Sequence, residues 1–479
     1  MGTEIPCPKL GSQVQTAGMS NSVTLQFLGA AGTVTGSRFA LHSNQSTVLV
    51  DAGLFQGLKE LRLKNWDQFP IKPSHIDAIV LTHAHLDHCG YLPALVRDGF
   101  NGKIFATEWT IKLAEVILRD SARLQMEDAE YAARKGYSKH SNPKPIYTTT
   151  DVEATLPLFV PVDFRQPVAV TPDCTAIFYP SGHVLGSAFV EIQMADKRVV
   201  FTGDMGRPFH PLLRAPDRIP DGPLDAIITE STYGDRSHDV PSSVFADAIN
   251  RTLKRGGSVL IPAFAVDRTE VILMELRRLM DEQTIPRVPV YADSPMALTT
   301  LDYYRQALKQ SSIEIKPEIA AAYAEHDPFD PGTLQEVRSV EESIKLNKPV
   351  RPSIIISASG MATGGRVVHH LKGMLPNPNN TVLLVGFQAA GTRGRYLADG
   401  AESIKMYGKY VPVRAEVVQV GSFSVHADND EMLGWLERAD PAPTTVYVVH
   451  GEQEAADTFA RRIRKDLEWL AVVPRDGEK

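Results

Sequence analysis

Few cysteines occur in this 479-residue sequence, and their positions exclude one class of protein. Cys7, Cys89 and Cys174 are too few and too far apart to form a disulfide framework. Such cysteine usage is typical of proteins that work in a reducing cytoplasm. We therefore expect a cytoplasmic protein and not a disulfide-rich secreted domain.

Long apolar runs are also absent. No run reaches the roughly 18 consecutive apolar residues that a membrane-spanning helix needs, so we expect no membrane association. The first twenty residues contain Pro6, Pro8, Gly11 and Gly18 and have no apolar centre, which excludes a secretory signal. Residues 1–21 are predicted to form a polar leader.

An excess of positive charge is the third absence. The formal net charge is −7, so the surface as a whole does not attract nucleic acid. A polyanionic ligand would need a local basic groove, with metal ions supplying part of the positive charge. Hydrophobic content of 43% and charged content of 22% are typical of a globular protein. The length predicts about two or three domains.

The sequence does contain a dense histidine cluster at the end of an apolar strand. Residues 79–81 lead to His83, His85, Asp87 and His88. One ion rarely takes four ligands from so short a segment, so two neighbouring ions are expected. His83 and His85 lie on one side of an extended segment and would hold the first ion. These ligand types suit zinc best, and then manganese or iron. A closed structural zinc site is the alternative, but such sites are usually rich in cysteine.

Later strands each deliver one polar residue at their carboxyl end. The strands expected at 176–179, 198–202 and 224–229 lead to His183, Asp204 and Glu230. This regularity favours a single site at the edge of the sheets, where Asp204 would bridge two cations about 3.5–4 Å apart. Asp51 ends an earlier strand and is expected to orient metal-binding histidines, with a turn cap as the alternative.

After Gly234 the pattern changes to four strand–loop–helix units, which predict a parallel, doubly wound sheet. Their strands are expected at 258–261, 289–292, 353–357 and 381–385. The loop after the third strand precedes a helix and is a candidate phosphate cradle, although a plain turn is the alternative. The predicted phosphate contacts are Ser357, Ser359, Gly360, Arg268 and Arg366.

The order of these motifs, followed by Ser424-Val-His426-Ala-Asp and Val449-His450-Gly-Glu, is similar to that of the β-CASP nucleases of the metallo-β-lactamase superfamily. These include RNA-processing endonucleases of the cleavage and polyadenylation factor type and their bacterial and archaeal relatives. The resemblance covers residues 22 to about 470. It implies an αββα metallo-β-lactamase sandwich with an inserted doubly wound α/β domain. The implied limits are 22–230 and 425–479 for the metal domain and 231–424 for the β-CASP domain.

The resemblance also implies two Zn²⁺ per chain, with Mn²⁺ as a substitute. Glu230 and His426 match family positions that stabilise the site and transfer protons, with Asp204 as the shared ligand. Relatives often read Ala-Val-Gly-Arg where this chain has Ala265-Val-Asp-Arg268, so Asp267 is expected to alter contacts with the sugar–phosphate backbone. The implied ligands are His83, His85 and His183 for one zinc, Asp87, His88 and His450 for the other, and Asp204 between them.

The function implied is zinc-dependent hydrolysis of single-stranded RNA by hydroxide generated in the cleft between the domains. In the family, a histidine at the position of His450 accompanies RNA substrates, whereas DNA-directed members usually carry valine. The alternatives are a DNA nuclease of the same family, another hydrolase of the superfamily, and a non-enzymatic scaffold. The long insertion and the complete ligand set argue against the last two. Endonuclease and 5′-3′ exonuclease action both stay open, and so does a homodimer.

Overall fold

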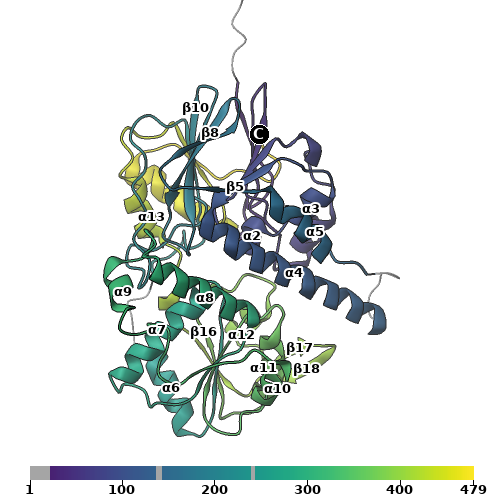
Figure 1. The fold of residues 1–479 in the computed structure, drawn as a ribbon, viewed down its shortest axis with the longest axis vertical. Coiled ribbons are helices and arrows are strands. Elements are labelled where there is room, and N and C mark those ends of the chain that lie inside the picture. The colour runs from purple at the N-terminus through teal and green to yellow at the C-terminus, as the bar shows by residue number, and fades with distance from the viewer. Residues whose placement is uncertain (1–21, 136–142, 239–242) are drawn as a thin grey trace, which may run out of the picture.

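The computed structural model describes residues 22–135, 143–238 and 243–479. The predicted leader, residues 1–21, lies outside this part of the chain. Figure 1 shows two lobes, one built on the first two sheets and one built on the third, with helices α4 (Glu108–Lys135) and α8 (Pro295–Lys309) between them. Within the described residues, no helix is long and apolar enough to cross a membrane.

The first sheet has six strands in sequence order. The first three strands pair antiparallel and the later ones parallel. Its outer face is covered by short helices and by the apolar side of α4, including Leu113 and Leu118. The strands are β1 (Thr24–Phe27), β2 (Phe39–His42), β3 (Thr47–Val50), β4 (Ala78–Val80), β5 (Lys103–Thr107) and β6 (Phe159–Val162), and the short helices are α1 (Lys59–Leu63), α2 (Leu86–Cys89), α3 (Leu92–Arg97) and α5 (Thr149–Thr155).

The second sheet faces the first across an apolar layer. Side chains such as Phe39 and Phe201, with ring centroids 5.9 Å apart, fill the space between the sheets. Helices α13 (Asn429–Leu436) and α14 (Gln453–Arg462) cover the outer face, where Trp435 and Phe459 pack. In sheet order the strands are β21 (Ala471–Val472), β20 (Thr445–Val448), β11 (Ala226–Thr229), β10 (Lys197–Phe201), β9 (Ala188–Met194), β8 (Cys174–Pro180) and β7 (Pro167–Thr171). These two sheets with outer helices confirm the predicted αββα sandwich.

The third sheet is parallel throughout and has helices on both faces, which confirms the predicted doubly wound insertion. Buried aliphatic side chains alternate between the two faces, because successive residues of a strand point in opposite directions. In sheet order its strands are β14 (Leu334–Glu336), β13 (Val290–Ala292), β15 (Ile354–Ser357), β12 (Val259–Pro262), β16 (Thr381–Leu384) and β19 (Glu416–Gln419).

The helices of this lobe divide between the two faces of the sheet. One face packs against α6 (Val244–Lys254), α7 (Arg268–Asp281) and α8, and the other against α10 (Val340–Leu346), α11 (Arg366–Met374) and α12 (Arg393–Ala398). Helix α8 begins with Ser294, whose hydroxyl accepts from the Ala297 amide, and Pro295 follows at the first helical position. Helix α9 (Pro317–Ala322) and the hairpin β17 (Ser403–Met406)–β18 (Lys409–Pro412) complete this part.

Arg366, predicted to contact a phosphate, has a different role in the fold. Its guanidinium donates to Asp293 Oδ1 over 2.6 Å and to the carbonyls of Val337 and Arg338. Asp293 is fully buried and also accepts from His370 and Ser343, each over 2.6 Å. Burial acts to raise the pKa of Asp293, but these three donors hold it below its usual value. Arg366 is therefore the partner of a buried carboxylate.

We predict that Asp293→Ala lowers the free energy of unfolding by about 3 kcal/mol, because Arg366 and His370 then stay buried without their acceptor. Urea denaturation at neutral pH measures this loss. Glu341→Ala, at an exposed position of α10, is the control and should change stability by less than about 0.5 kcal/mol. Since folding lowers the pKa of Asp293, the difference between wild type and variant is full above pH about 4 and disappears as the pH falls further. Equal stability of the two variants would contradict this role.

Candidate metal centre

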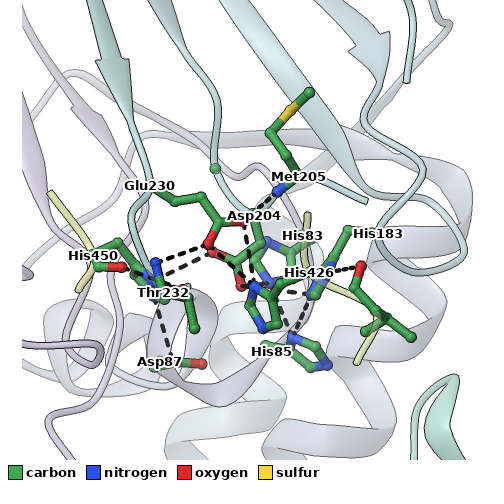
Figure 2. Close-up of polar contacts among 12 residues, drawn as sticks. His83, His85, Asp87, His183, Asp204, Met205, Glu230, Thr232, His426 and His450 are labelled. Atoms are coloured by element: carbon green, nitrogen blue, oxygen red, sulfur yellow. Dashed lines mark hydrogen bonds and ion pairs between the residues drawn. The ribbon is translucent and has the colours of Figure 1, made fainter. Parts of the chain in front are cut away.

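The polar residues predicted from strand ends meet at one edge of the two facing sheets. His83 follows β4, His183 follows β8 and Asp204 follows β10, while Glu230 and His450 follow β11 and β20. Figure 2 shows Asp204 in the middle of this group, with His85 and His183 on one side and His450 and Asp87 on the other. The structure thus brings together residues that are more than three hundred positions apart in the sequence.

The first donor group consists of His83, His85, His183 and Asp204. His85 Nδ1 lies 3.1 Å from His83 Nε2 and 3.2 Å from His183 Nε2. Asp204 Oδ2 lies 3.4 Å from His83 Nε2 and 3.5 Å from His183 Nε2. A tetrahedron with zinc–ligand bonds of about 2.0–2.1 Å places its ligand atoms about 3.3–3.4 Å apart. Three nitrogens and one oxygen at these separations fit a zinc ion.

Asp87, His88 and His450 form the second donor group. We include in it the other oxygen of Asp204, because this oxygen lies beside His88 and His450. His88 Nε2 lies 3.0 Å from His450 Nε2 and 3.2 Å from Asp204 Oδ1. Asp87 Oδ2 lies 3.6 Å from His450 Nε2. These atoms are also close enough to share one cation.

Asp204 is the residue that both groups have in common. Its carboxylate is 2% exposed, and Oδ1 has no hydrogen-bond donor among the described residues. Burial acts to raise the pKa of Asp204, but the neighbouring imidazoles, His450 and His88 foremost, hold it well below its usual value. A buried carboxylate with an unpartnered oxygen between imidazoles is a donor set that suits divalent cations.

Most donors of the first group are neutral, as metal ligation requires. Burial lowers the pKa of His83, lowers that of His85 to about 3, and lowers that of His183 well below its usual value. In the second group, burial acts in the same direction, but Asp204 and the neighbouring carboxylates raise the pKa of His88 and His450. Binding of a cation to the second group would therefore release protons from its histidines. The histidines of the first group already offer unprotonated nitrogen atoms.

Asp51 orients one of the predicted ligands. Its Oδ2 accepts from His88 Nδ1 over 2.7 Å, and its carboxylate also accepts from the amide and hydroxyl of Thr82. This pairing directs His88 Nε2 toward Asp204. Asp51 and His450 have φ angles of 58° and 48°, a left-handed conformation that is unfavourable for these residues. Such strain is concentrated at functional sites.

Glu230 and His426 form a pair beside the two donor groups. Glu230 is buried, and its carboxylate accepts from the Met205 amide over 2.6 Å and from His426 Nδ1 over 3.2 Å. Burial acts to lower the pKa of His426, but Glu230 and then Asp204 raise it above its usual value. Because Nδ1 is bound to Glu230, Nε2 is the atom of His426 that is free to exchange a proton with a substrate.

The residues predicted to contact phosphate are not all available for this role. Arg268 is 3% exposed, and its guanidinium donates to the Val385 carbonyl inside the core. Ser357 is buried and donates to the Asp293 carbonyl, whereas Ser359 is partly exposed and pairs with the Thr363 hydroxyl. Gly360 packs against the ring of Phe264, whose centroid lies 6.2 Å from that of His85. The loop therefore lies near the centre. Arg268 and Arg366 both have partners within the chain, and their contact with a phosphate stays a prediction.

Asp267 was expected to alter contacts with the sugar–phosphate backbone, and the structure gives its side chain no direct contact of this kind. The side chain is fully buried and accepts from His210 Nε2 and the Tyr304 hydroxyl, each over 2.9 Å. Its φ angle of 65° fits a position where related sequences often have glycine. Asp267 is therefore part of a buried network between the lobes and has no exposed oxygen for a nucleic acid.

Sequence reasoning missed two threonines that support the centre. Thr82 pairs with Asp51 and lies 3.1 Å from His83 Nδ1, and Thr232 lies 3.2 Å from His450 Nδ1. The Thr82 hydroxyl contacts the ring nitrogen of His83 that points away from the donor group, whereas the Thr232 hydroxyl contacts His450 Nδ1, which also lies 3.6 Å from Asp204 Oδ1. Both contacts help to fix the orientation of the imidazole. The available signal was position, because Thr82 directly precedes His83 and Thr232 follows Glu230 by two residues.

Comparisons with known proteins agree with this arrangement. Family models match the chain over three segments: the metallo-beta-lactamase superfamily at residues 36–237, the Beta-Casp domain at 269–397, and the Zn-dependent metallo-hydrolase RNA specificity domain at 410–474. Ribonuclease TTHA0252 of Thermus thermophilus is 36% identical over 433 residues, which cover 89% of this chain and 92% of that protein.

Two archaeal relatives extend the comparison. The transcription termination factor FttA of Methanosarcina mazei is 30% identical, covering 93% of this chain and 69% of that protein. The RNase J-like protein of Methanocaldococcus jannaschii is 29% identical, covering 95% and 99%. The chain therefore belongs to the β-CASP ribonuclease family of the metallo-β-lactamase superfamily. It is a metal-dependent hydrolase of the nuclease class.

We predict that Asp204→Ala weakens zinc binding by at least about 100-fold. Loss of a group that only supports a ligand costs up to about 100-fold, and loss of a ligand itself should cost at least as much. Both donor groups should be affected, because one oxygen of Asp204 faces each of them. Zinc content after saturation and gel filtration, measured by mass spectrometry of the metal, checks this. Asp67→Ala, an exposed carboxylate outside the centre, should bind zinc as the wild type does. Wild-type zinc content in Asp204→Ala would contradict the shared position of this carboxylate.

Proposed function

We propose that this chain is a zinc-dependent ribonuclease that hydrolyses phosphodiester bonds of single-stranded RNA with two zinc ions. The observation that carries the proposal is the position of the Asp204 carboxylate between two donor groups, with the Glu230–His426 pair beside it. His83, His85 and His183 would hold one ion, Asp87, His88 and His450 the other, and Asp204 both. When bound, the ions supply positive charge for the phosphoryl oxygens and lower the pKa of the attacking water.

The chain's own residues supply the proton transfer and the orientation. Glu230 accepts from His426 Nδ1 and so fixes the ring, while Nε2 carries the proton that passes to the leaving oxygen of the cleaved bond. The raised pKa of His426, which follows from Glu230 opposing the effect of burial, keeps this proton available near neutral pH. Asp51 and Thr232 contact the rings of His88 and His450 and so fix the orientation of these two imidazoles.

Several observations support RNA as the substrate. The names of two relatives agree with it, since one is a ribonuclease and another is RNase J-like. The C-terminal segment, which delivers His450, matches an RNA specificity domain. Among the donors only His85 and Asp87 are partly exposed, so a flexible single strand reaches the centre more readily than a stiff duplex.

The test compares single-stranded RNA and single-stranded DNA of the same sequence, end-labelled, with the zinc-loaded protein. We expect cleavage of RNA, loss of cleavage with a chelator, and recovery with added zinc. A ladder of products would assign endonuclease action, and mononucleotides would assign stepwise action from an end. Equal cleavage of DNA would assign a DNA nuclease of the same family, and intact RNA would overturn the proposal.

We further predict that His426→Ala keeps zinc but cleaves RNA about 10²–10⁴-fold more slowly, because a positioned proton donor contributes a factor of this size. Single-turnover rates and zinc content, measured on the same preparation, separate the two effects. His75→Ala is the matched control, because His75 is exposed and precedes β4, whereas His83 follows that strand. Loss of zinc in His426→Ala, or a wild-type rate, would be incompatible with the assigned role.

A further inference from the structure

The loop that carries His183 is held from the opposite lobe. This loop, residues 183–187, lies in the metal domain, directly after β8. The Leu185 amide donates to the Tyr304 hydroxyl over 3.1 Å, and the Gly186 amide donates to Glu314 Oε1 over 2.6 Å. Tyr304 lies on α8, and Glu314 lies in the segment between α8 and α9, both in the inserted domain. All these contacts are buried.

Among the described residues, the metal domain provides no hydrogen-bond acceptor for the amides of Leu185 and Gly186. The Gly186 carbonyl accepts from the hydroxyls of Thr107 and Thr110 over 2.6 and 2.7 Å. The amides of His183 and Val184 donate to Ser187 Oγ over 3.1 and 3.0 Å. The Ser187 amide donates to the Val184 carbonyl over 3.0 Å. The other two amides of the loop, those of residues 185 and 186, find their acceptors only in Tyr304 and Glu314 among the described residues. Buried amides require such acceptors, so the loop has this shape only when the inserted domain is docked.

The Tyr304 hydroxyl is itself fixed in direction. It donates to Asp267 Oδ1 over 2.9 Å, which leaves its lone pairs for the Leu185 amide. Asp267 Oδ2 accepts in turn from His210 Nε2, and His210 Nδ1 accepts from the amides of Leu212 and Leu213. This buried chain starts in the metal domain at His210, passes through the inserted domain and returns to the metal domain at Leu185.

Gly186 has the conformation that brings the loop close to both lobes. Its φ angle is +84°, and a Cβ atom there would lie 2.4 Å from the Thr110 amide nitrogen. The loop therefore cannot move toward its own domain to find other acceptors. A shift of residues 185 and 186 would move His183, whose Nε2 lies 3.2 Å from His85 Nδ1 and 3.5 Å from Asp204 Oδ2 in the first donor group.

We propose that Tyr304 and Glu314 are positioning residues for the metal ligand His183, so that docking of the inserted domain completes the first donor group. This inference rests on the proposed function, in which His183 holds zinc. Neither side chain contacts the centre directly, and both act through the backbone of the His183 loop. The inserted domain would then do more than cover the substrate, because the metal affinity itself depends on it.

The carboxyl group of Glu314 suggests a matched set of variants. Burial raises the pKa of Glu314 to about 8, so the neutral acid is the prevailing form near neutral pH. Glu314→Gln keeps the size and the carbonyl-type acceptor for the Gly186 amide, whereas Glu314→Leu keeps the size and removes the acceptor. Tyr304→Phe removes a single oxygen atom. Tyr303→Phe, at the partly exposed neighbouring position of α8, is the control.

The experiment titrates Zn²⁺ into the metal-free full-length proteins in competition with a chromogenic chelator, and measures kcat and KM on a single-stranded RNA oligonucleotide. We expect Tyr304→Phe and Glu314→Leu to bind one of two zinc equivalents about 10–100-fold more weakly, the range for losing an outer partner of a metal ligand. The value of kcat should fall while KM stays within about 2-fold of wild type. Glu314→Gln and Tyr303→Phe should resemble the wild type.

The outcomes separate this inference from the proposed function. If wild type binds two zinc ions and cleaves RNA, unchanged zinc affinity in Tyr304→Phe and Glu314→Leu overturns the positioning role. If wild type binds zinc but leaves RNA intact, the proposed function fails, and the affinity comparison still decides the inference. A wild type without zinc affinity overturns both. Circular dichroism monitors folding, and if Glu314→Leu does not fold, Tyr304→Phe decides.

Discussion

The structure depends on one buried electrostatic arrangement, a carboxylate enclosed by imidazoles. Asp204 has neighbouring histidines on both of its oxygens and is 2% exposed. Burying such a charge is costly unless opposite charge lies next to it. Two sheets and a return segment converge on this point, and the left-handed backbone at Asp51 and His450 is tolerated there. Much of the sandwich thus serves to hold the side chains of the two donor groups around Asp204.

The centre was largely predictable because its ligands follow strand ends. His83, His85, Asp87 and His88 lie within six positions, so their proximity is fixed by the sequence. His183 and Asp204 follow apolar strands, and these two strands end at the same edge of the sheet because both run antiparallel to β9. The place of His450 depended on the resemblance, because pairing of β20 with β11 joins residues more than two hundred positions apart.

The arginines and Asp267 show where sequence reasoning is insufficient. The sequence shows where an arginine lies in the chain, but it does not show whether its guanidinium binds a phosphate or a carboxylate of the same chain. Arg366 meets Asp293, 73 positions away, and Arg268 meets a backbone carbonyl of β16's following loop, 117 positions away. Asp267 is turned inward because Tyr304 and His210 approach from different lobes. These partners are set by tertiary packing, on which local spacing carries no information.

The place of β20 in the second sheet has a consequence for the biosynthesis of this protein. The strand pairs beside β11, yet the whole inserted domain is translated between them. Until β20 has been translated, this side of β11 has no partner strand and is an unprotected sheet edge. At that stage the second donor group also lacks the imidazole of His450. A product that stops before β20 therefore carries an incomplete centre.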